Sequence, residues 1–422
     1  MKQPNFYTSV LLAWLSATHT AYSELPKGKT WETSSFKEIL QHYEFVADLR
    51  VRPAERHISK ELFWRYPIPL PTAEFEIDHS LGDEAGEMPA TEGATLPIRH
   101  MNLGRILYRE GKYDQARRIW LTARARFGNI FEYHRRNDYL AAVAFLKLAQ
   151  EKGKQFNYAY GDRNVRIPYS NVATFLSWAF IKKAHIPDPL LEQVAPKGLY
   201  LLAVLYLTFQ RFNAAQATAA SGLDFLKANG RNEYRTGFNE IIAENWIRNR
   251  DYYTAIRTLD ENIRSTSEPK VAARAFHRIA DIYFDLNQYD LADEVYRMAQ
   301  AVDRHAYQIH PLSYFLRGES LFWRGLFKEA REALKYSLYA NELPHAKPKL
   351  KTIFIAWAKL RLADTYLALY REHKDKGTKS SKELGKILSK AKLEYYKVSH
   401  HFPLTEPGEI AQVRRDCLEL PV

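Results

Sequence analysis

The chain has 422 residues, of which 46% are hydrophobic and 14% aromatic, so it can build a sizeable core in one long or two ordinary domains. Its single cysteine, Cys417, excludes an intramolecular disulfide. The formal net charge of +12 favours acidic partners, whether nucleic acid, anionic lipid or an acidic protein surface.

The first residues have the pattern of a cleaved secretory signal. Lys2 precedes an apolar run over 10–17, and the small residues Ala21 and Ser23 stand just before Glu24. The run is far shorter than the roughly 20 residues that a membrane-spanning helix needs. We therefore expect residues 1–23 to be removed, and a cysteine-poor exported chain favours a bacterial periplasm, with no cysteine at the cleavage point to make it a lipoprotein. The alternative is a buried N-terminal helix.

No second long apolar segment is apparent, so the sequence predicts no membrane span. Residues 24–96 instead form an irregular, proline-containing extension. Pro67, Pro69 and Pro71 alternate within an aromatic segment and force an extended backbone. An acidic, glycine-containing stretch follows over 78–93 and is typical of a loop. We expect this region to act as a cap or strap along the rest of the protein; a ligand for a proline-reading domain is the alternative.

The stretch 276–301 has the spacing of two paired helices. Phe276, Ile279, Ala280 and Tyr283 fall at i, i+3, i+4 and i+7, which is one face of an α-helix. After a polar break, a second apolar face begins, with Ala292 as its small residue. Two small residues let helix backbones approach closely while aromatic rings fill the space around them. The pattern predicts a helical hairpin.

The same hairpin pattern recurs along the chain. In each complete copy the small residue of the first helix precedes the small residue of the second by 12 positions. The pairs are Gly104 and Ala116, Ala203 and Ala215, Ala243 and Ala255, Ala280 and Ala292, and Gly318 and Ala330; Ala363 and Ala391 form a last, longer pair.

These copies resemble the tetratricopeptide repeat (TPR) family. The first copy has the signature of an aromatic residue, Leu-Gly, a large residue and Ala-x3-aromatic, carried by His100, Leu103, Gly104, Leu107, Ala116 and Trp120. The resemblance covers residues 97–403 and implies an all-α, right-handed superhelical solenoid of hairpins. Steps of 37 to 45 residues between anchors exceed the family's usual 34 and indicate longer connections. Inserts are expected at about 151–169 and at the lysine-rich 371–390, and residues 404–422 are expected to form a tail.

The resemblance also implies a concave groove lined by the first helices. The position after the small residue, which often faces the groove in this family, holds four successive acidic residues. With neighbouring groove positions, the predicted partner-binding set is Glu244, Asp281, Asp285, Phe284, Phe315, Glu319, Phe322, Trp323, Trp357 and Asp364. Such a groove would suit a peptide with basic and aromatic residues. The alternative is structural, because Arg278 and Arg361 each stand three residues before one of these aspartates.

A second candidate surface is basic. Six arginines crowd one stretch and form a possible anion patch: Arg117, Arg118, Arg124, Arg126, Arg135 and Arg136. A solvated helix face is the alternative interpretation of such a run.

No catalytic, metal or cofactor motif stands out. The sequence lacks H-E-x-x-H, G-x-S-x-G and a complete phosphate-binding loop, and its histidines lack metal-site spacing. We therefore predict a non-enzymatic scaffold of the bacterial cell envelope that binds a protein or peptide partner in its groove, with nucleic acid an improbable ligand for an exported chain. A cytoplasmic nucleic-acid or anion binder and an envelope polysaccharide-processing protein are the alternatives.

Overall fold

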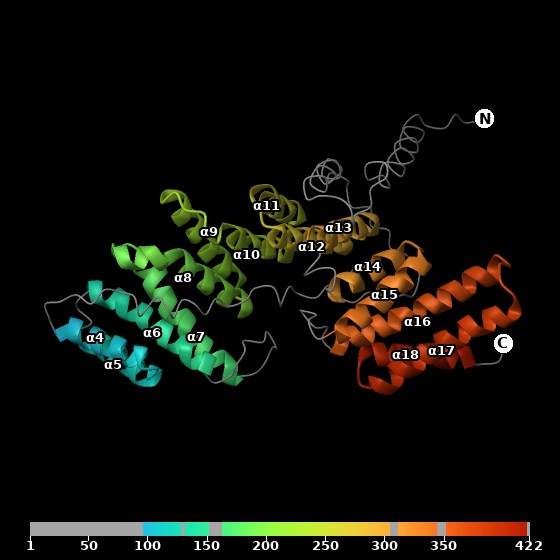
Figure 1. Cartoon of the computed structure of the whole chain (residues 1–422), viewed down its shortest axis with the longest axis horizontal. Helices are drawn as coiled ribbons and strands as arrows, with labels where there is room; N and C mark the ends of the chain where they lie inside the picture. Colours follow the sequence, from blue (N-terminus) through green and yellow to red (C-terminus); the bar gives the residue numbers. More distant parts are fainter. Residues whose placement is uncertain (1–95, 128–130, 152–162, 304–310, 344–351, 420–422) are drawn as a thin grey trace, which may run out of the picture. The chain divides into compact units, whose positions relative to one another are not determined.

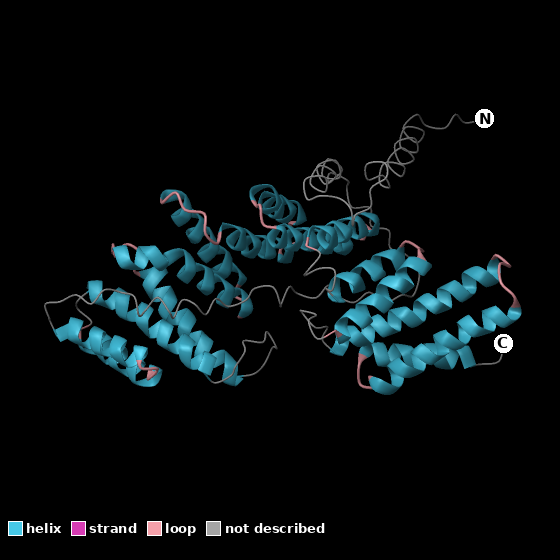
Figure 2. Cartoon of the chain, in the orientation of Figure 1, coloured by secondary structure: helices cyan, strands magenta, loops and turns pink. Residues whose placement is uncertain are grey.

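The computed structural model describes residues 96–127, 131–151, 163–303, 311–343 and 352–419. Within these ranges the chain forms α-helices, one π-helical turn and no strand, as Figure 2 shows. The helices are α4 (Leu96–Arg109), α5 (Tyr113–Arg126), α6 (Phe131–Glu151), α7 (Arg163–Ser177), the π-turn η1 (Trp178–Lys182), α8 (Pro189–Thr208), α9 (Phe212–Ala228), α10 (Arg235–Arg248), α11 (Tyr252–Ser265), α12 (Pro269–Asp285), α13 (Tyr289–Val302), α14 (Pro311–Trp323), α15 (Phe327–Glu342), α16 (Thr352–Asp375), α17 (Ser381–His401) and α18 (Glu406–Glu419).

The helices pair as hairpins in the predicted register. Both small residues of every predicted pair are buried, as the close approach of two helix backbones requires. Two glycines from different hairpins show how close this approach is. A methyl group on Gly104 would lie 2.2 Å from Trp120 Nε1, and one on Gly318 would lie 2.7 Å from Leu334 Cγ. The predicted register of the hairpins is therefore confirmed.

The turn inside each regular hairpin has one repeated conformation. A residue with positive φ follows the first small residue by seven positions in five hairpins, at Gly111, Gln210, Arg250, Asn287 and Gly325. The next backbone N–H donates to the carbonyl five residues earlier, as from Lys112 to Leu107 at 2.9 Å. This hydrogen bond closes the end of the first helix in a left-handed cap and returns the chain for the second helix.

The chain divides into two compact units, with the boundary inside α11 between Glu261 and Asn262. From α4 to α10 and from α12 to α18, helices pack on their neighbours in sequence, and alternate helices also touch, as for α8 with α10 and α16 with α18 (Figure 1). Each unit is thus a stack of helical hairpins, which confirms the predicted all-α, TPR-like solenoid class. The predicted signal segment and the proline-containing cap lie outside the described residues.

Helix α8 is an exception to the prediction that no further long apolar segment occurs. Over Pro189–Thr208 it is long and apolar enough to cross a membrane, with a mean hydropathy of 1.3 in its most apolar 18-residue window, but 56% of that window is buried inside the protein. Burial of this extent is typical of a core helix. Asp188 caps its start by accepting hydrogen bonds from the backbone N–H groups of Leu190 and Leu191.

Of the regions expected to be inserts and a tail, the described residues are largely helical, and residues 152–162 of the first insert lie outside them. Residues 163–169 belong to α7, and the lysine-rich stretch lengthens α16 and α17 instead of forming a loop between them. In this hairpin the turn residue with positive φ, Gly377, follows Ala363 by fourteen positions. The expected tail contains α18, which packs on α16 and α17. For the lysine-rich stretch and the tail the reason is compositional, because their Leu, Lys, Glu and Ala residues are strong helix formers.

Candidate interaction surface

The aromatic residues predicted to line a groove are part of the core. Phe284 and Phe315 are fully buried, and Phe322 and Trp357 are also buried, while Trp323 is partly exposed. Their rings pack on other helices, as Phe322 does on Phe327 at 5.5 Å between centroids. The hairpins use these buried rings for their own packing, so their contact with a partner stays a prediction.

The four successive acidic residues Glu244, Asp281, Glu319 and Asp364, which we call the acidic row, are also buried. The neighbouring Asp285 is exposed. On α12, Asp281 accepts hydrogen bonds from Arg278 Nη1 at 2.9 Å and from Tyr296 Oη of α13 at 2.7 Å. His277 lies beside them, with its Nδ1 3.7 Å from Asp281 Oδ2. Burial, helped by the charge of Arg278, lowers the pKa of His277 to about 3, so the ring is neutral and this approach is not an ion pair.

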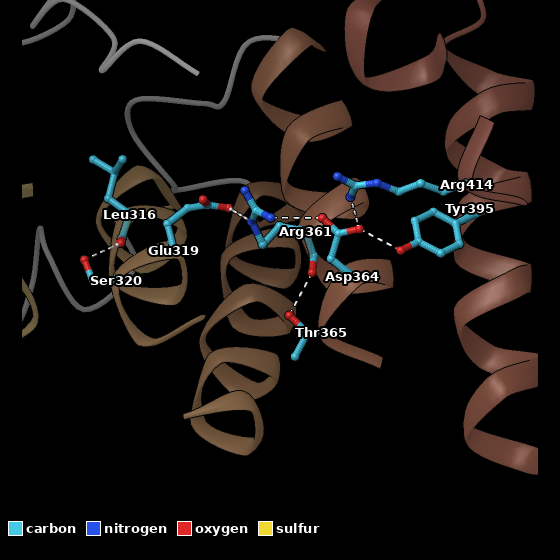
Figure 3. A network of polar contacts seen from close by, with 8 residues as sticks. All are labelled: Leu316, Glu319, Ser320, Arg361, Asp364, Thr365, Tyr395 and Arg414. Carbon is cyan, nitrogen blue, oxygen red and sulfur yellow. Dashed lines mark hydrogen bonds and ion pairs between the residues drawn. The ribbon is translucent and has the colours of Figure 1, made fainter. Parts of the chain in front are cut away.

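The same arrangement recurs in the last hairpin, shown in Figure 3. Arg361 of α16 donates to Asp364 at 2.9 Å and, through Nε, to Glu319 of α14 at 2.6 Å. Asp364 also accepts from Tyr395 of α17 at 2.6 Å and forms an ion pair with Arg414 of α18. One connected network therefore joins four helices, α14, α16, α17 and α18.

The electrostatics explain why these carboxylates need their partners. Burial raises the pKa of Asp281 and Glu319, while Arg278 and Arg361 respectively act to lower it. Burial and the charge of Asp364 also raise the pKa of Tyr395 well above its usual value, so the phenol stays a hydrogen-bond donor. Because a buried charge without a partner is costly, these groups stabilise the fold. Of the acidic row, Asp281, Glu319 and Asp364 are structural, and Glu244 is buried.

The arginines of the possible anion patch do not form one basic surface. Arg117 and Arg118 both pair with Asp114, and Arg124 pairs with the buried Asp138 at 2.8 Å. The guanidinium of Arg124 also lies 3.8 Å from the centre of the Trp178 ring in the π-turn.

The remaining members of that set serve the fold near α8. Arg136 pairs with Asp188 at 2.6 Å, while the buried Arg135 donates to the carbonyl of Ala179 at 2.7 Å and to that of Ile186. Arg126 is exposed. Five of the six arginines are thus held by acidic side chains or carbonyls, and anion binding by this set stays a prediction.

An exposed surface that suits a partner lies instead on α17. Its outward residues are Lys382, Lys386 and Lys390, followed by Leu393, Tyr396 and His400, and we call these six the α17 stripe. Their spacing places them on one side of the helix, opposite the buried Ala391. Leu393 is 50% exposed and Tyr396 47% exposed. The stripe therefore presents positive charge over its first half and apolar surface over its second.

The helix that carries the stripe is anchored at its first turn and along its buried side. A capping box at Ser380 and Glu383 begins α17, and Tyr395 on the buried side bonds Asp364. Tyr396 stacks on His400, with ring centroids 5.5 Å apart, and lies under Arg415 of α18. Within the described residues, Lys382, Lys386 and Lys390 form no ion pair. The sequence analysis predicted the lysine-rich stretch but not the apolar half of the stripe. The i, i+3, i+7 spacing of Leu393, Tyr396 and His400 could have indicated it.

Nothing in the described part of the chain groups three His, Cys, Asp or Glu side chains in a way that could hold a metal ion. Residues 273–305, which span α12 and α13, match the family model for the tetratricopeptide repeat. Residues 273–305 are a tetratricopeptide repeat. This TPR contains the Asp281 to Tyr296 hydrogen bond described above, and the predicted resemblance is confirmed there. A sequence comparison with curated proteins finds no match.

Several solved structures are similar to this chain at low identity and with TM-scores below 0.5. The C-terminal part of a TPR repeat-containing protein from Cytophaga hutchinsonii is 12% identical with a TM-score of 0.44, over 74% of this chain and 98% of that one. PilF of Pseudomonas aeruginosa is 13% identical with a TM-score of 0.42, over 66% and 99%. A Rap protein complexed with Competence and Sporulation Factor is 14% identical with a TM-score of 0.39, over 76% and 97%. Likeness at this distance concerns the fold, and we take no function from it.

Proposed function

We propose that the protein is a non-enzymatic interaction scaffold whose α17 stripe binds a protein partner. The observation that carries this proposal is the stripe itself, in which a row of lysines without ion pairs runs into exposed Leu393 and Tyr396 on a helix anchored by a buried network. Exposed aromatic and apolar side chains on a rigid support are the usual anchors of a protein interface.

The charge of the stripe selects an acidic, amphipathic partner segment. Like charges four residues apart repel one another on a helix by about 0.2 to 0.5 kcal/mol per pair, and a negatively charged ligand relieves that repulsion. Leu393 and Tyr396 then offer contacts to apolar side chains of the same segment. A basic partner fits less well, because the carboxylates expected to bind it, apart from Asp285, are buried, and Asp281, Glu319 and Asp364 are paired.

Export to the bacterial envelope is a further part of the proposal, supported by the predicted signal over 1–23. Sequencing of the mature N-terminus tests it directly. A start at Glu24 supports a periplasmic scaffold, whereas retention of Met1 overturns export and favours a cytoplasmic role.

The partner-binding role is tested by crosslinking and pull-down with full-length variants of the stripe. Lys382→Gln, Lys386→Gln and Lys390→Gln together remove the charge, and Leu393→Ser with Tyr396→Ser removes the apolar half. The matched controls are Lys227→Gln, Lys270→Gln and Lys328→Gln, which remove the same charge from other exposed positions, and Tyr253→Ser on α11.

A protein captured by the wild type and by both controls, but lost from both stripe variants, supports the proposal. Equal capture by all variants overturns it. If only the lysine variant loses a ligand, and that ligand is a nucleic acid bound with steep salt dependence, the stripe is a polyanion site and the anion-binding alternative holds.

A further inference from the structure

A second charged cluster lies away from the α17 stripe and was not singled out in the sequence. Asp293 of α13 is buried, and three arginines converge on its carboxylate. Arg297 of the same helix approaches it at 3.2 Å, Arg317 of α14 at 2.9 Å and Arg324, just after α14, at 3.0 Å. We call these four residues the Asp293 cluster.

The Asp293 cluster carries more positive than negative charge. Three guanidinium groups share one carboxylate, which leaves an excess of two positive charges. Within the described residues, Asp293 is the one carboxylate that these arginines contact. The amide oxygen of Gln300, which is uncharged, accepts from Arg317 at 3.4 Å. Partly buried excess charge of this kind is unfavourable unless an anion joins it.

The cluster is both ordered and open to a ligand. Asp293 holds all three guanidinium groups, and Gln300, itself bonded to Ser313 at 3.1 Å, helps to fix Arg317. The arginine side chains remain 33%, 22% and 33% exposed for Arg297, Arg317 and Arg324. Arg297 Nε is buried and has no acceptor among the described residues. Since each guanidinium has five N–H donors, most donors of the cluster are available.

We propose that the Asp293 cluster binds a phosphate dianion, either the free anion or the monoester of a phosphorylated side chain. The ligand's charge of about −2 near neutral pH would balance the excess of two positive charges. Its oxygens accept paired hydrogen bonds from planar guanidinium groups, which is the geometry that arginine offers and lysine does not. Asp293 acts as a positioning residue that gathers the arginines before the ligand arrives.

Binding is tested on the full chain by isothermal titration and by the shift of the melting temperature at constant ionic strength. The probes are inorganic phosphate, O-phosphoserine and, as a monovalent comparison, chloride. The test variant is Arg297→Gln with Arg324→Gln, which leaves one arginine for one carboxylate. The control is Lys328→Gln with Arg331→Gln, which removes the same charge from one exposed and one partly exposed position on α15. Circular dichroism verifies that each variant is folded, and Arg324→Gln alone replaces the double variant if that one unfolds.

We expect saturable binding of both phosphate probes to the wild type and the control, and an affinity at least about tenfold weaker in the test variant, because charge-assisted hydrogen bonds are lost. Tighter binding of O-phosphoserine than of inorganic phosphate assigns the site to a phosphorylated side chain, and equal binding assigns it to the free anion. The proposal is overturned if phosphate binds no better than chloride, or if the test variant binds as the wild type does.

Discussion

Gly104 is a position where the hairpin packing leaves no room for a side chain. A methyl group there would meet the fully buried Trp120 ring at 2.2 Å. We predict that Gly104→Ala lowers the free energy of unfolding by about 1 to 3 kcal/mol, the usual cost of overpacking a tight core. Denaturant unfolding measures the change.

The matched control is another helical glycine with open space around it. Gly385 on α17 is exposed, and a methyl group there would meet no atom within 4 Å. Gly385→Ala is expected to raise stability by about 0.5 to 1 kcal/mol, because alanine has the better helix propensity. Loss of stability at Gly385, or none at Gly104, would contradict the packing argument.

His277 makes stability depend on pH. Its pKa is about 3 in the fold and 6.5 ordinarily, so below pH 6.5 the unfolded chain takes up a proton that the folded chain refuses. Stability should therefore fall as pH decreases from about 6.5 towards 3, by at most about 1.4 kcal/mol per pH unit. Asp281, whose pKa burial raises, acts in the opposite direction.

The variant His277→Gln isolates the histidine, since its side chain does not titrate while Asp281, Arg278 and Tyr296 are unchanged. Melting temperatures between pH 6.5 and 4 should decline less steeply in the variant than in the wild type. Parallel declines would show that His277 is not the source of the pH dependence.

Helix α18 is fastened to the last hairpin through Asp364. This carboxylate is already held by Arg361 and Tyr395, so Arg414→Gln should leave the hairpin folded while it weakens the attachment of α18. Loss of one charge-assisted hydrogen bond corresponds to about 1.5 to 3 kcal/mol. We predict that amide hydrogen exchange over 406–419 accelerates by at least about tenfold.

Arg415→Gln is the control for that experiment, because Arg415, whose side chain is 22% exposed, contacts Asp416 and the Tyr396 ring instead of Asp364. It should change exchange in α18 little. Equal acceleration in both variants would mean that surface charge, and not the Asp364 network, holds this helix.

At the scale of the whole molecule, stability should be local. Within each of the two units, helices contact their neighbours in sequence, and a stack of this kind behaves as a one-dimensional array. We therefore predict that Gly104→Ala accelerates hydrogen exchange in α4, α5 and α6 but leaves α16, α17 and α18 unchanged. Uniform acceleration along the chain would instead indicate a single cooperative unit.

The regular hairpins were predictable because their packing is encoded at short range. The spacing of Ala280 and Ala292, with a turn residue between, sets both helices and their contact without knowledge of distant residues. The last hairpin was predicted as a longer pair, but the helical structure of its lysine-rich stretch was not. A lysine-rich run indicates a charged surface more clearly than it indicates a helix. The turn of this hairpin is at Gly377, a single glycine within the lysine-rich run.

The fate of the acidic row depends on contacts that spacing alone does not give. Arg361 lies three residues from Asp364, which sequence showed as an alternative, but its bond to Glu319 joins two hairpins. The position after the first small residue suggested a groove. Hydrogen bonds from Tyr296 and Tyr395 instead hold Asp281 and Asp364 inside the hairpins. The α17 stripe became visible once burial assigned the opposite face of the helix to the core.

The position of Gly377 shows how a helical hairpin can be lengthened by design. In α16 the turn comes seven residues later than in the regular hairpins, and seven residues are close to two full helical turns. The inner face of the longer helix therefore keeps its angular phase while its tip advances by about 10 Å. Hairpins of this design should accept further length in steps of seven residues, so that a binding arm can be extended without rewriting the core that supports it.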